Sequence, residues 1–507
     1  MASNSACVRF LLNGDAVEVA APDPHLTLLE WLREERRLTG SKEGCAEGDC
    51  GACTVVLGER SRDAGGRDRV ALAPINACLR LLPTLDGKAV FTVEGLRSVG
   101  GALHPTQQAL VDRHASQCGF CTPGFVMALF ALFKTSPTPS RDEACVALAG
   151  NLCRCTGYRP ILDAAQTMYQ YDGAGARSEH ERWLFTPATA DAPPLPGESE
   201  LAARLAALAR DDALAYESAD AAFIAPRSVA ELASAVLATP EAWILGGGTD
   251  VGLWITKALQ RSRRIISTGE VAALREVSDD GATLCIGAAV PLEEAFRALN
   301  RHYPELASVW TRFASVPIRS SGTLGGNVAN GSPIGDSMPA LIALGAAVVL
   351  RRGEHTRTLP LEALYLDYRK QAREPGEWIE AIVVPIRADA STRRVAAYKN
   401  ARRNEQDISA VFLAIALDLH AGRIDGARVA CGGMAGVPKR ATHVERALNG
   451  ADWNEATIRS AMRAMADDFT PLDDLRASAE HRLRVARNLL LRFWHEQDDR
   501  NVEARVF

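Results

Sequence analysis

The hydrophobic pattern at the start of the chain predicts a small sheet followed by helices. Apolar and polar positions alternate through residues 7–20 on either side of Asn13 and Gly14, which is typical of a β-hairpin. A short helix is expected from Thr27, whose hydroxyl can cap its first turn. Residues 125–133 are almost wholly apolar and predict a buried helix, and Ser140 begins a capping box for the next one.

Longer strands are predicted further along. Residues 242–245 form a short apolar run that leads into three consecutive glycines, as a buried strand would before a tight turn. Residues 408–434 predict two long strands joined at Ala421 and Gly422, and the remainder of the chain is predicted to be helical. The stretch 172–215 is rich in Pro, Gly and small residues and is expected to be an interdomain linker.

Length, charge and hydropathy restrict the class of protein. A chain of 507 residues exceeds what one core accommodates, so we expect a multidomain α+β protein. The net charge of −5 argues against a nucleic-acid-binding surface, which would be strongly basic. No apolar run reaches the roughly 18 residues of a membrane-spanning helix, and the N-terminus lacks the pattern of a secretory signal. We therefore expect a cytoplasmic protein that contacts neither membrane nor nucleic acid.

The twelve cysteines are placed unevenly, with ten of them in the first 155 residues. In a reducing compartment, clustered cysteines indicate a metal site rather than disulfides. Four cysteines stand outside the motifs and are predicted to be buried small hydrophobic residues: Cys7, Cys145, Cys285 and Cys431.

One cysteine group has the spacing of plant-type ferredoxins. Cys45, Cys50 and Cys53 give C-x4-C-x2-C, and Cys78 is the candidate fourth ligand. The glycines between them allow positive φ, so that backbone N–H groups can surround a cluster and donate to its sulfurs. A zinc site is the alternative, but it rarely needs so many glycines among its ligands. The spacing therefore favours a [2Fe–2S] cluster in a β-grasp fold.

A second group consists of two close pairs, Cys118 with Cys121 and Cys153 with Cys155. The short turn between the predicted helices implies antiparallel packing, which would bring the two pairs together. Four thiolates brought together in this way suit an iron–sulfur cluster or a structural zinc ion. The spacing alone does not decide between them.

Two glycine-rich loops are candidate phosphate-binding sites. One is GGGTD at 246–250, and the other is SSGTLGGNVANGSPIGD at 320–336. Glycines let the backbone approach a phosphate closely, and two such loops could close on both phosphates of one dinucleotide. GGGTD lacks the G-x-G-x-x-G spacing of a Rossmann fold. The alternative for each loop is a tight turn without a ligand.

Taken in tandem, the cysteine motifs resemble those of the xanthine dehydrogenase/molybdenum hydroxylase family. After the ferredoxin-type motif the chain carries QCGFCTPGF and NLCRCTGYRPI, and all eight motif cysteines are present. The resemblance implies two [2Fe–2S] clusters, one held by Cys45, Cys50, Cys53 and Cys78 and the other by Cys118, Cys121, Cys153 and Cys155.

The resemblance also implies a domain order. The expected domains are a β-grasp ferredoxin-like [2Fe–2S] domain (1–88), a four-helix [2Fe–2S] domain (89–171), the linker (172–215), a non-Rossmann, PCMH-type α+β FAD-binding domain (216–390) and an α+β C-terminal domain like that of CO dehydrogenase flavoproteins (391–507).

Both glycine loops are similar to the family's FAD-binding loops. By motif, the residues expected to contact FAD are Ile244, Leu245, Gly246, Gly247, Gly248, Thr249, Asp250, Val251, Phe313, Ala314, Thr323, Gly325, Gly326, Asn327, Asp336, Ile379 and Lys399. Tyr368 and Asp407 are the candidates for NAD⁺ binding. Gln406 stands where the NAD-using animal enzymes have an acidic residue, so this chain departs from the family there.

The order cluster, cluster, flavin implies an electron-transfer function, because iron–sulfur centres move single electrons and a flavin can deliver a hydride. Full-length family members continue with a molybdenum-binding part. The resemblance therefore implies the small subunit of a two-subunit xanthine dehydrogenase, which would oxidise hypoxanthine and xanthine to urate in purine catabolism. Electrons would pass from molybdopterin in a large subunit, in an (αβ)₂ heterotetramer, through both clusters and FAD to NAD⁺.

No side chain of this chain is expected to attack the substrate. One alternative is the corresponding subunit of another molybdenum hydroxylase, acting on an aldehyde or an N-heterocycle. An alternative of a different class is a non-enzymatic electron carrier or a scaffold held together by zinc, and it predicts that the chain binds no flavin.

Overall fold

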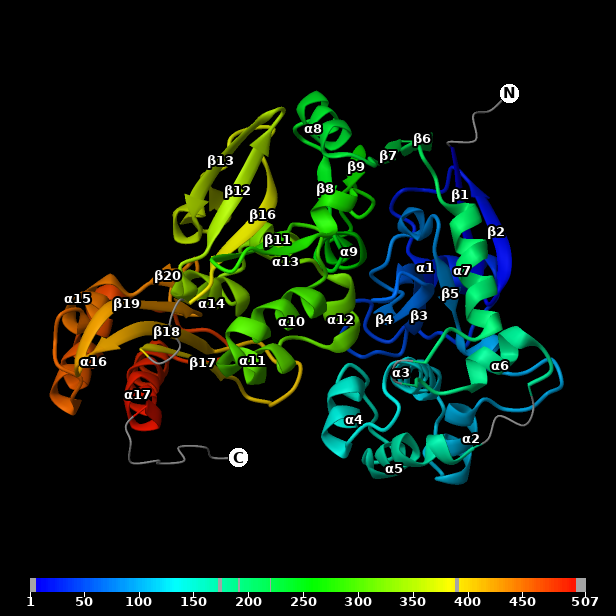
Figure 1. Cartoon of the computed structure of the whole chain (residues 1–507), viewed down its shortest axis with the longest axis horizontal. Coiled ribbons are helices and arrows are strands. Elements are labelled where there is room, and N and C mark those ends of the chain that lie inside the picture. The colour runs from blue at the N-terminus through cyan, green and yellow to red at the C-terminus, as the bar shows by residue number, and fades with distance from the viewer. Residues whose placement is uncertain (1–5, 172–175, 190–191, 219, 388–391, 498–507) are drawn as a thin grey trace. The chain divides into compact units, whose positions relative to one another are not determined.

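The computed structural model describes residues 6–171, 176–189, 192–218, 220–387 and 392–497 (Figure 1). Parts of the predicted ferredoxin-like domain, of the linker, of the FAD-binding domain and of the C-terminal domain lie outside the described residues. The chain forms two compact units. The first comprises the chain up to Leu232, Glu241–Glu270 and Ala314–Gly322. The second comprises Ala233–Pro240, Val271–Phe313 and the chain from Thr323.

The first unit begins with a five-stranded sheet in the order β2-β1-β5-β3-β4. Its strands are β1 (Cys7–Leu12), β2 (Asp15–Ala20), β3 (Thr54–Arg62), β4 (Asp68–Asn76) and β5 (Ala89–Phe91). The predicted hairpin is confirmed, because β1 and β2 pair through a turn in which Asn13 and Gly14 have positive φ. Thr27 caps α1 (Leu28–Glu30) as expected by accepting from Glu30 N–H, and a π-helical turn, η2 (Trp31–Glu35), follows.

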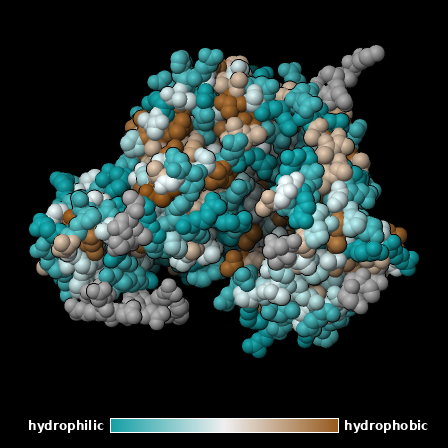
Figure 2. All heavy atoms as spheres, viewed as in Figure 1, coloured by the Kyte–Doolittle hydropathy of each residue, from teal (hydrophilic) through white to brown (hydrophobic). Residues whose placement is uncertain are grey.

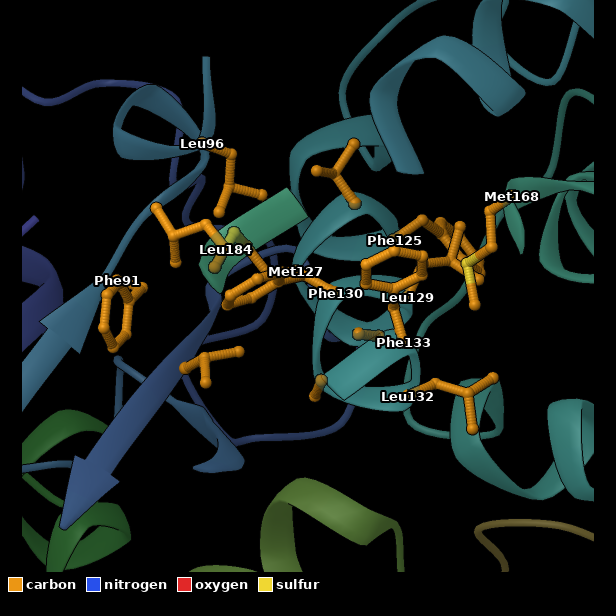
Figure 3. Packing of buried hydrophobic residues seen from close by; sticks show 14 of the residues in the cluster. Phe91, Leu96, Phe125, Met127, Leu129, Phe130, Leu132, Phe133, Met168 and Leu184 are labelled. Atoms are coloured by element: carbon orange, nitrogen blue, oxygen red, sulfur yellow. The ribbon is translucent and has the colours of Figure 1, made fainter. Parts of the chain in front are cut away.

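A helical region follows and shares a core with this sheet. Its helices are α2 (Pro105–Asp112), α3 (Thr122–Thr135), α4 (Arg141–Leu148) and α5 (Arg159–Thr167). The predicted apolar helix is confirmed as α3, and Ser140 caps α4 in a capping box. Figure 3 shows side chains of α3 gathered with Phe91, Leu96 and Leu184. The rings of Phe91 and Phe130 lie 6.0 Å apart, so sheet and helices bury a common apolar cluster.

The described part of the predicted linker is more closely packed than its composition indicates. It contains α6 (Glu179–Phe185) and α7 (Pro196–Leu208). Trp183, Phe185 and Leu201 are buried in the same cluster as α3. Lys134 of α3 donates to the carbonyl oxygens of Trp183 and Thr186, which fixes the end of α6. Sparse apolar residues at helical spacing sufficed to fold this segment onto the helical region.

A second sheet of the first unit has the order β6-β7-β9-β8. Its strands are β6 (Leu214–Ser218), β7 (Ala221–Ala225), β8 (Trp243–Leu245) and β9 (Arg264–Ser267). The strand predicted before the three glycines is confirmed as β8, which pairs in parallel with β9. Two short helices, α9 (Val251–Thr256) and α12 (Val316–Ser321), complete the unit, and α8 (Val229–Ala238) carries the chain across the boundary of the two units.

The second unit contains an antiparallel sheet in the order β10-β11-β16-β12-β13. Its strands are β10 (Val277–Asp279), β11 (Thr283–Gly287), β12 (Ala347–Arg352), β13 (His355–Pro360) and β16 (Trp378–Pro385). The helices of this part are α10 (Leu292–His302), α11 (Ala307–Thr311), α13 (Leu324–Asn330) and α14 (Ser337–Leu344), and a small ribbon is formed by β14 (Tyr365–Asp367) and β15 (Lys370–Gln371).

The C-terminal part of the second unit is a four-stranded sheet with helices. Its elements are β17 (Arg393–Asn400), β18 (Val411–His420), β19 (Arg423–Gly432), β20 (Lys439–Arg440), α15 (Thr442–Leu448), α16 (Glu455–Asp468) and α17 (Ala479–Gln497). The two long strands are confirmed as β18 and β19, joined at Ala421 and Gly422, which both have positive φ. Apolar residues of the three helices bury a common core with these strands.

Hydrophilic residues cover most of the face in Figure 2, where apolar residues form only small patches. No helix within the described residues is both long and apolar enough to span a membrane.

The four cysteines outside the motifs were predicted to be buried. This prediction is correct for Cys431, which is fully buried, whereas Cys7 and Cys285 are half-buried. It is wrong for Cys145, which is exposed because α4 buries Ala144 and Leu148 instead.

Candidate metal and cofactor sites

The four cysteines of the ferredoxin-type motif come together as two pairs. Cys53 and Cys78 are both 2 % exposed, and their sulfurs lie 3.3 Å apart. Cys45 and Cys50 form the other pair, in which the Cys50 thiol donates to the Cys45 sulfur. Among the described residues, no three or more His, Cys, Asp or Glu side chains are placed to hold one metal ion. Two sulfur pairs suit a two-iron cluster, with one pair for each iron, better than a single zinc ion.

Hydrogen bonds prepare this site for thiolates, the form in which cysteine binds metal. The bond from Cys50 lowers the pKa of Cys45 to about 5, against burial, which raises it. The backbone N–H groups of Glu47 and Cys50 also donate to the Cys45 sulfur, each at 3.4 Å. The pKa of Cys53 is lowered chiefly by its hydrogen bond with Cys78. The donor set and its N–H groups therefore fit an iron–sulfur cluster.

The second cysteine group sits where two helices meet a loop. Cys121 is the residue before α3, and Cys153 and Cys155 lie in the loop between α4 and α5. Cys153 and Cys155 were expected at the end of the preceding helix, but that helix, α4, ends at Leu148. Cys118 and Cys155 are exposed, whereas Cys153 is buried.

Two of these sulfurs interact. Burial and a hydrogen bond with Cys153 raise the pKa of Cys121 to about 12. Burial acts to raise the pKa of Cys153 as well, but hydrogen bonds with Thr156 and Cys121 bring it below its usual value. The Thr156 hydroxyl lies 3.2 Å from the Cys153 sulfur. The structure thus brings one cysteine of each predicted pair into contact, as antiparallel helices imply.

The two cysteine loops touch each other directly. The N–H of Leu152 donates to the carbonyl of Cys50 at 3.0 Å, and the Asn151 side chain donates to Gly51 O at 2.9 Å. Gly51 has a φ of +67°, and a Cβ there would lie 2.2 Å from Gly150 O. Gly124 is equally confined, since its Cβ would lie 2.2 Å from Gly51 O. Both loops therefore depend on glycine for their close approach.

The loop 246–250 packs against the first cysteine loop within the same unit. Gly248 has a φ of +80°, and a Cβ there would lie 3.2 Å from the carbonyl oxygen of Leu79, the residue after Cys78. Thr256, at the end of α9, donates to Ala46 O at 2.7 Å. Burial raises the pKa of Asp250 in this loop. The predicted residues 244–251 therefore lie next to the ferredoxin-type cysteines.

In the second unit, the part of the other glycine loop from Thr323 onward forms the start of α13. Thr323 caps this helix by accepting from Gly326 N–H. A Cβ on Gly325 would lie 2.4 Å from that of Ala288, so only glycine fits there. The Asn327 side chain accepts from the hydroxyl of Ser337.

Asp336 and Lys399 form a buried ion pair. Their side chains are 4 % and 3 % exposed, and the Lys399 ammonium lies 2.6 Å from Asp336 Oδ2. Ser409, which sequence reasoning missed, donates to Asp336 Oδ1 at 2.6 Å. Nothing in the local sequence distinguishes this serine from a turn residue; only the packing of α14, which begins after Asp336, against β18, which follows Ser409, brings the two side chains together.

The remaining predicted residues are more scattered. Phe313 is buried edge-on against Phe296, Ile379 is buried on β16, and Ala314 belongs to the first unit. Tyr368 is exposed, with the Arg369 guanidinium over its ring. Asp407 accepts from the backbone N–H groups of 402 and 403, which keeps its pKa low despite partial burial.

Four family profiles match the chain in order. They are a 2Fe-2S iron-sulfur cluster binding domain (10–81), a [2Fe-2S] binding domain (92–166), an FAD binding domain in molybdopterin dehydrogenase (217–387) and a CO dehydrogenase flavoprotein C-terminal domain (396–497).

Several curated relatives match most of the chain. Xanthine dehydrogenase of Drosophila subobscura is 34 % identical over 446 residues, which are 80 % of this chain and 32 % of the relative. Xanthine dehydrogenase of Emericella nidulans is 32 % identical over 98 % of this chain and 39 % of its own length. Aldehyde oxidase 4 of Cavia porcellus is 30 % identical over 96 % of this chain and 39 % of its own. The chain thus spans about a third to two fifths of these relatives.

Solved structures resemble part of the chain. A chain of carbon monoxide dehydrogenase from Hydrogenophaga pseudoflava is 25 % identical with a TM-score of 0.50, and the match covers 53 % of this chain and 94 % of that one. The four domains and their order, with the paired cysteines and glycine loops, show that this chain belongs to the molybdenum hydroxylase family and forms an iron–sulfur and flavin region of it.

Proposed function

We propose that this chain is the electron-transfer subunit of a xanthine dehydrogenase. It receives electrons from the molybdenum centre of a partner and passes them through two [2Fe–2S] clusters and FAD to NAD⁺. When bound, the clusters carry single electrons and the flavin supplies the two-electron step. One observation carries the proposal: in the first unit, the two cysteine loops and the glycine loop 246–250 lie in direct contact.

The contacts support a route for electrons from the second cysteine group to the first and then to the glycine loop 246–250. Cys118 and Cys155 are exposed, as suits a centre that receives electrons from another chain. From there, the hydrogen bond from Leu152 N–H to Cys50 O connects a neighbour of Cys153 to a cysteine of the buried centre. Leu79 follows Cys78 and contacts the glycine loop. The chain's own residues thereby hold the two centres and the glycine loop next to one another.

The surface around Cys118 and Cys155 is proposed to bind the molybdenum-containing partner. Three apolar side chains nearby in sequence are exposed, namely Phe120, Leu152 and Tyr158. Exposed apolar side chains that flank a functional site are typical of a protein interface. A complex structure in which the partner lies far from these cysteines would contradict this assignment. The (αβ)₂ heterotetramer is proposed on family resemblance alone.

The residues proposed to hold FAD are those named from the two glycine loops, together with Phe313, Ala314, Asp336, Ile379 and Lys399. The glycines fit that role because their backbone N–H groups can reach a phosphate where a side chain would not fit. The Asp336–Lys399 pair supplies a buried polar group of fixed orientation. Tyr368 and Asp407 are proposed to contact NAD⁺, and the domain boundaries given above remain predictions.

Xanthine is proposed as the substrate because the xanthine dehydrogenases that match are 34 % and 32 % identical over 80 % and 98 % of this chain. A second candidate is an aldehyde or an N-heterocycle, favoured by the matches to aldehyde oxidase 4 and to nicotinate hydroxylase hnxS of Emericella nidulans. The test is co-purification with a molybdenum-binding chain, followed by assay with hypoxanthine or xanthine and NAD⁺. Turnover of aldehydes or nicotinate in their place would support the second candidate and overturn the first.

A further inference from the structure

Asn76 is a buried amide beside the ferredoxin-type cysteines. It is the last residue of β4, two positions before Cys78, and it is 3 % exposed. Its side-chain Nδ2 donates to the Cys53 sulfur at 3.8 Å. The backbone carbonyl of Asn76 accepts from Leu79 and Arg80, but any residue could make those bonds. The turn into Cys78 therefore does not require this side chain.

The other end of the same amide is unsatisfied. Its Oδ1 is buried and has no hydrogen-bond partner. A buried polar atom without a partner destabilises the folded state, so an apolar side chain of the same size would suit the site better. The reverse orientation of the amide would direct an oxygen at a thiolate, which is repulsive. An unsatisfied Oδ1 is explained if the Asn76 side chain is retained for the hydrogen bond that its N–H group donates to the Cys53 sulfur.

We propose that Asn76 sets the reduction potential of the centre held by Cys45, Cys50, Cys53 and Cys78. This inference rests on the proposed function. Reduction brings one electron and no proton to the centre, so its negative charge increases. An N–H donor to a ligand sulfur stabilises the reduced form more than the oxidised form and raises the potential. Burial strengthens the effect, because a low dielectric increases the energy of the hydrogen bond.

The second centre has a side-chain donor of its own, which provides a matched control. The Thr156 hydroxyl lies 3.2 Å from the Cys153 sulfur. A metal-bound cysteine is a thiolate without a proton, so the threonine must be the donor. Asn76 and Thr156 therefore donate to ligands of different centres in one chain. In a variant of either residue, the potential of the other centre serves as the internal reference.

The experiment is a redox titration of the full chain, followed by EPR, for wild type, Asn76→Leu, Asn76→Asp and Thr156→Val. Asn76→Leu should lower the potential of one [2Fe–2S] signal and leave the other unchanged. At the wild-type midpoint, the ratio of reduced to oxidised centre should fall on the order of tenfold, as for the loss of one hydrogen bond to a charged group. Asn76→Asp should shift the same signal further because it adds a negative charge. Thr156→Val should shift only the other signal.

An unshifted potential in Asn76→Leu with both signals present overturns the inference. If Asn76→Leu fails to assemble the centre, the potential of Asn76→Asp, whose side chain has the same shape, tests the inference instead. Should both variants lose the centre, the side chain is structural and the inference is wrong. A wild-type chain without two [2Fe–2S] signals would instead refute the proposed function, so the two failures are distinguishable.

Discussion

Replacing Gly247 with alanine should weaken FAD binding without disturbing the iron–sulfur centres. A Cβ on Gly247 would lie 1.6 Å from Ser321 O and 2.7 Å from Gly322 Cα. The first distance is about 1.8 Å short of ordinary contact at 3.4 Å, and both partners are backbone atoms. No rotamer change can make room, so the glycine turn must move.

The structure allows an estimate of the cost. Overpacking of a well-packed site costs about 1–3 kcal/mol. If this strain falls on the FAD-bound conformation, the affinity for FAD should decrease about 5- to 150-fold. The φ of Gly247 is not positive, so the effect is purely steric and does not include the strain of a left-handed backbone.

The assay is FAD titration followed by flavin fluorescence, with iron content and EPR recorded on the same samples. Gly269→Ala is the matched control, because it lies in the same part of the first unit and its nearest neighbour, Ser267 Oγ, would be 3.8 Å away. Gly247→Ala should release flavin while Gly269→Ala and the iron content match wild type. Equal FAD affinity in the two variants would refute a role for this turn in flavin binding.

Three further predictions follow from the other sites. Cys118→Ser should remove one of two [2Fe–2S] EPR signals and stop NAD⁺ reduction by the holoenzyme while FAD stays bound; normal NAD⁺ reduction would contradict the assignment. Lys399→Met should lower the free energy of unfolding in urea by about 3–5 kcal/mol, because it leaves the Asp336 carboxylate buried without its cation. The double variant Lys399→Met/Asp336→Leu should regain most of that stability. A double variant no more stable than Lys399→Met would contradict the role given to this ion pair. Burial lowers the pKa of His104 to about 3. The unfolded chain takes up this proton near pH 6.5, so stability should fall as pH drops from about 6.5 toward 3, by up to about 1.4 kcal/mol per pH unit; an equally steep fall in His104→Asn would show that another group is responsible.

Local signals in the sequence predicted much of the fold. The hairpin follows from alternation around Asn13 and Gly14, whose φ values are positive as a tight turn requires. The cap at Ser140 and the apolar helix α3 likewise depend on residues within one or two turns of each other. The cysteine spacing predicted the candidate ligands because Cys45, Cys50 and Cys53 are close in sequence, as are the two members of each pair at 118/121 and 153/155.

Features that depend on distant contacts could not be predicted. Cys145 was expected to be buried, but only the packing of α4 determines that Ala144 and Leu148 face the core. Asn76 and Ser409 have no local signature, since their partners lie on other elements. The confinement of Gly247 by Ser321 joins residues more than 70 positions apart in sequence. Spacing therefore identified candidate ligands, whereas the groups that hold and tune them emerged only from the fold.

The central claim is that this one chain holds two [2Fe–2S] centres and a flavin. The most direct test measures iron, sulfide, zinc and FAD in the purified chain and records its EPR spectrum after reduction. The account predicts iron and sulfide for two [2Fe–2S] centres, one FAD per chain and two distinguishable EPR signals. Zinc in place of iron, a single EPR signal or a chain that cannot bind FAD would contradict it.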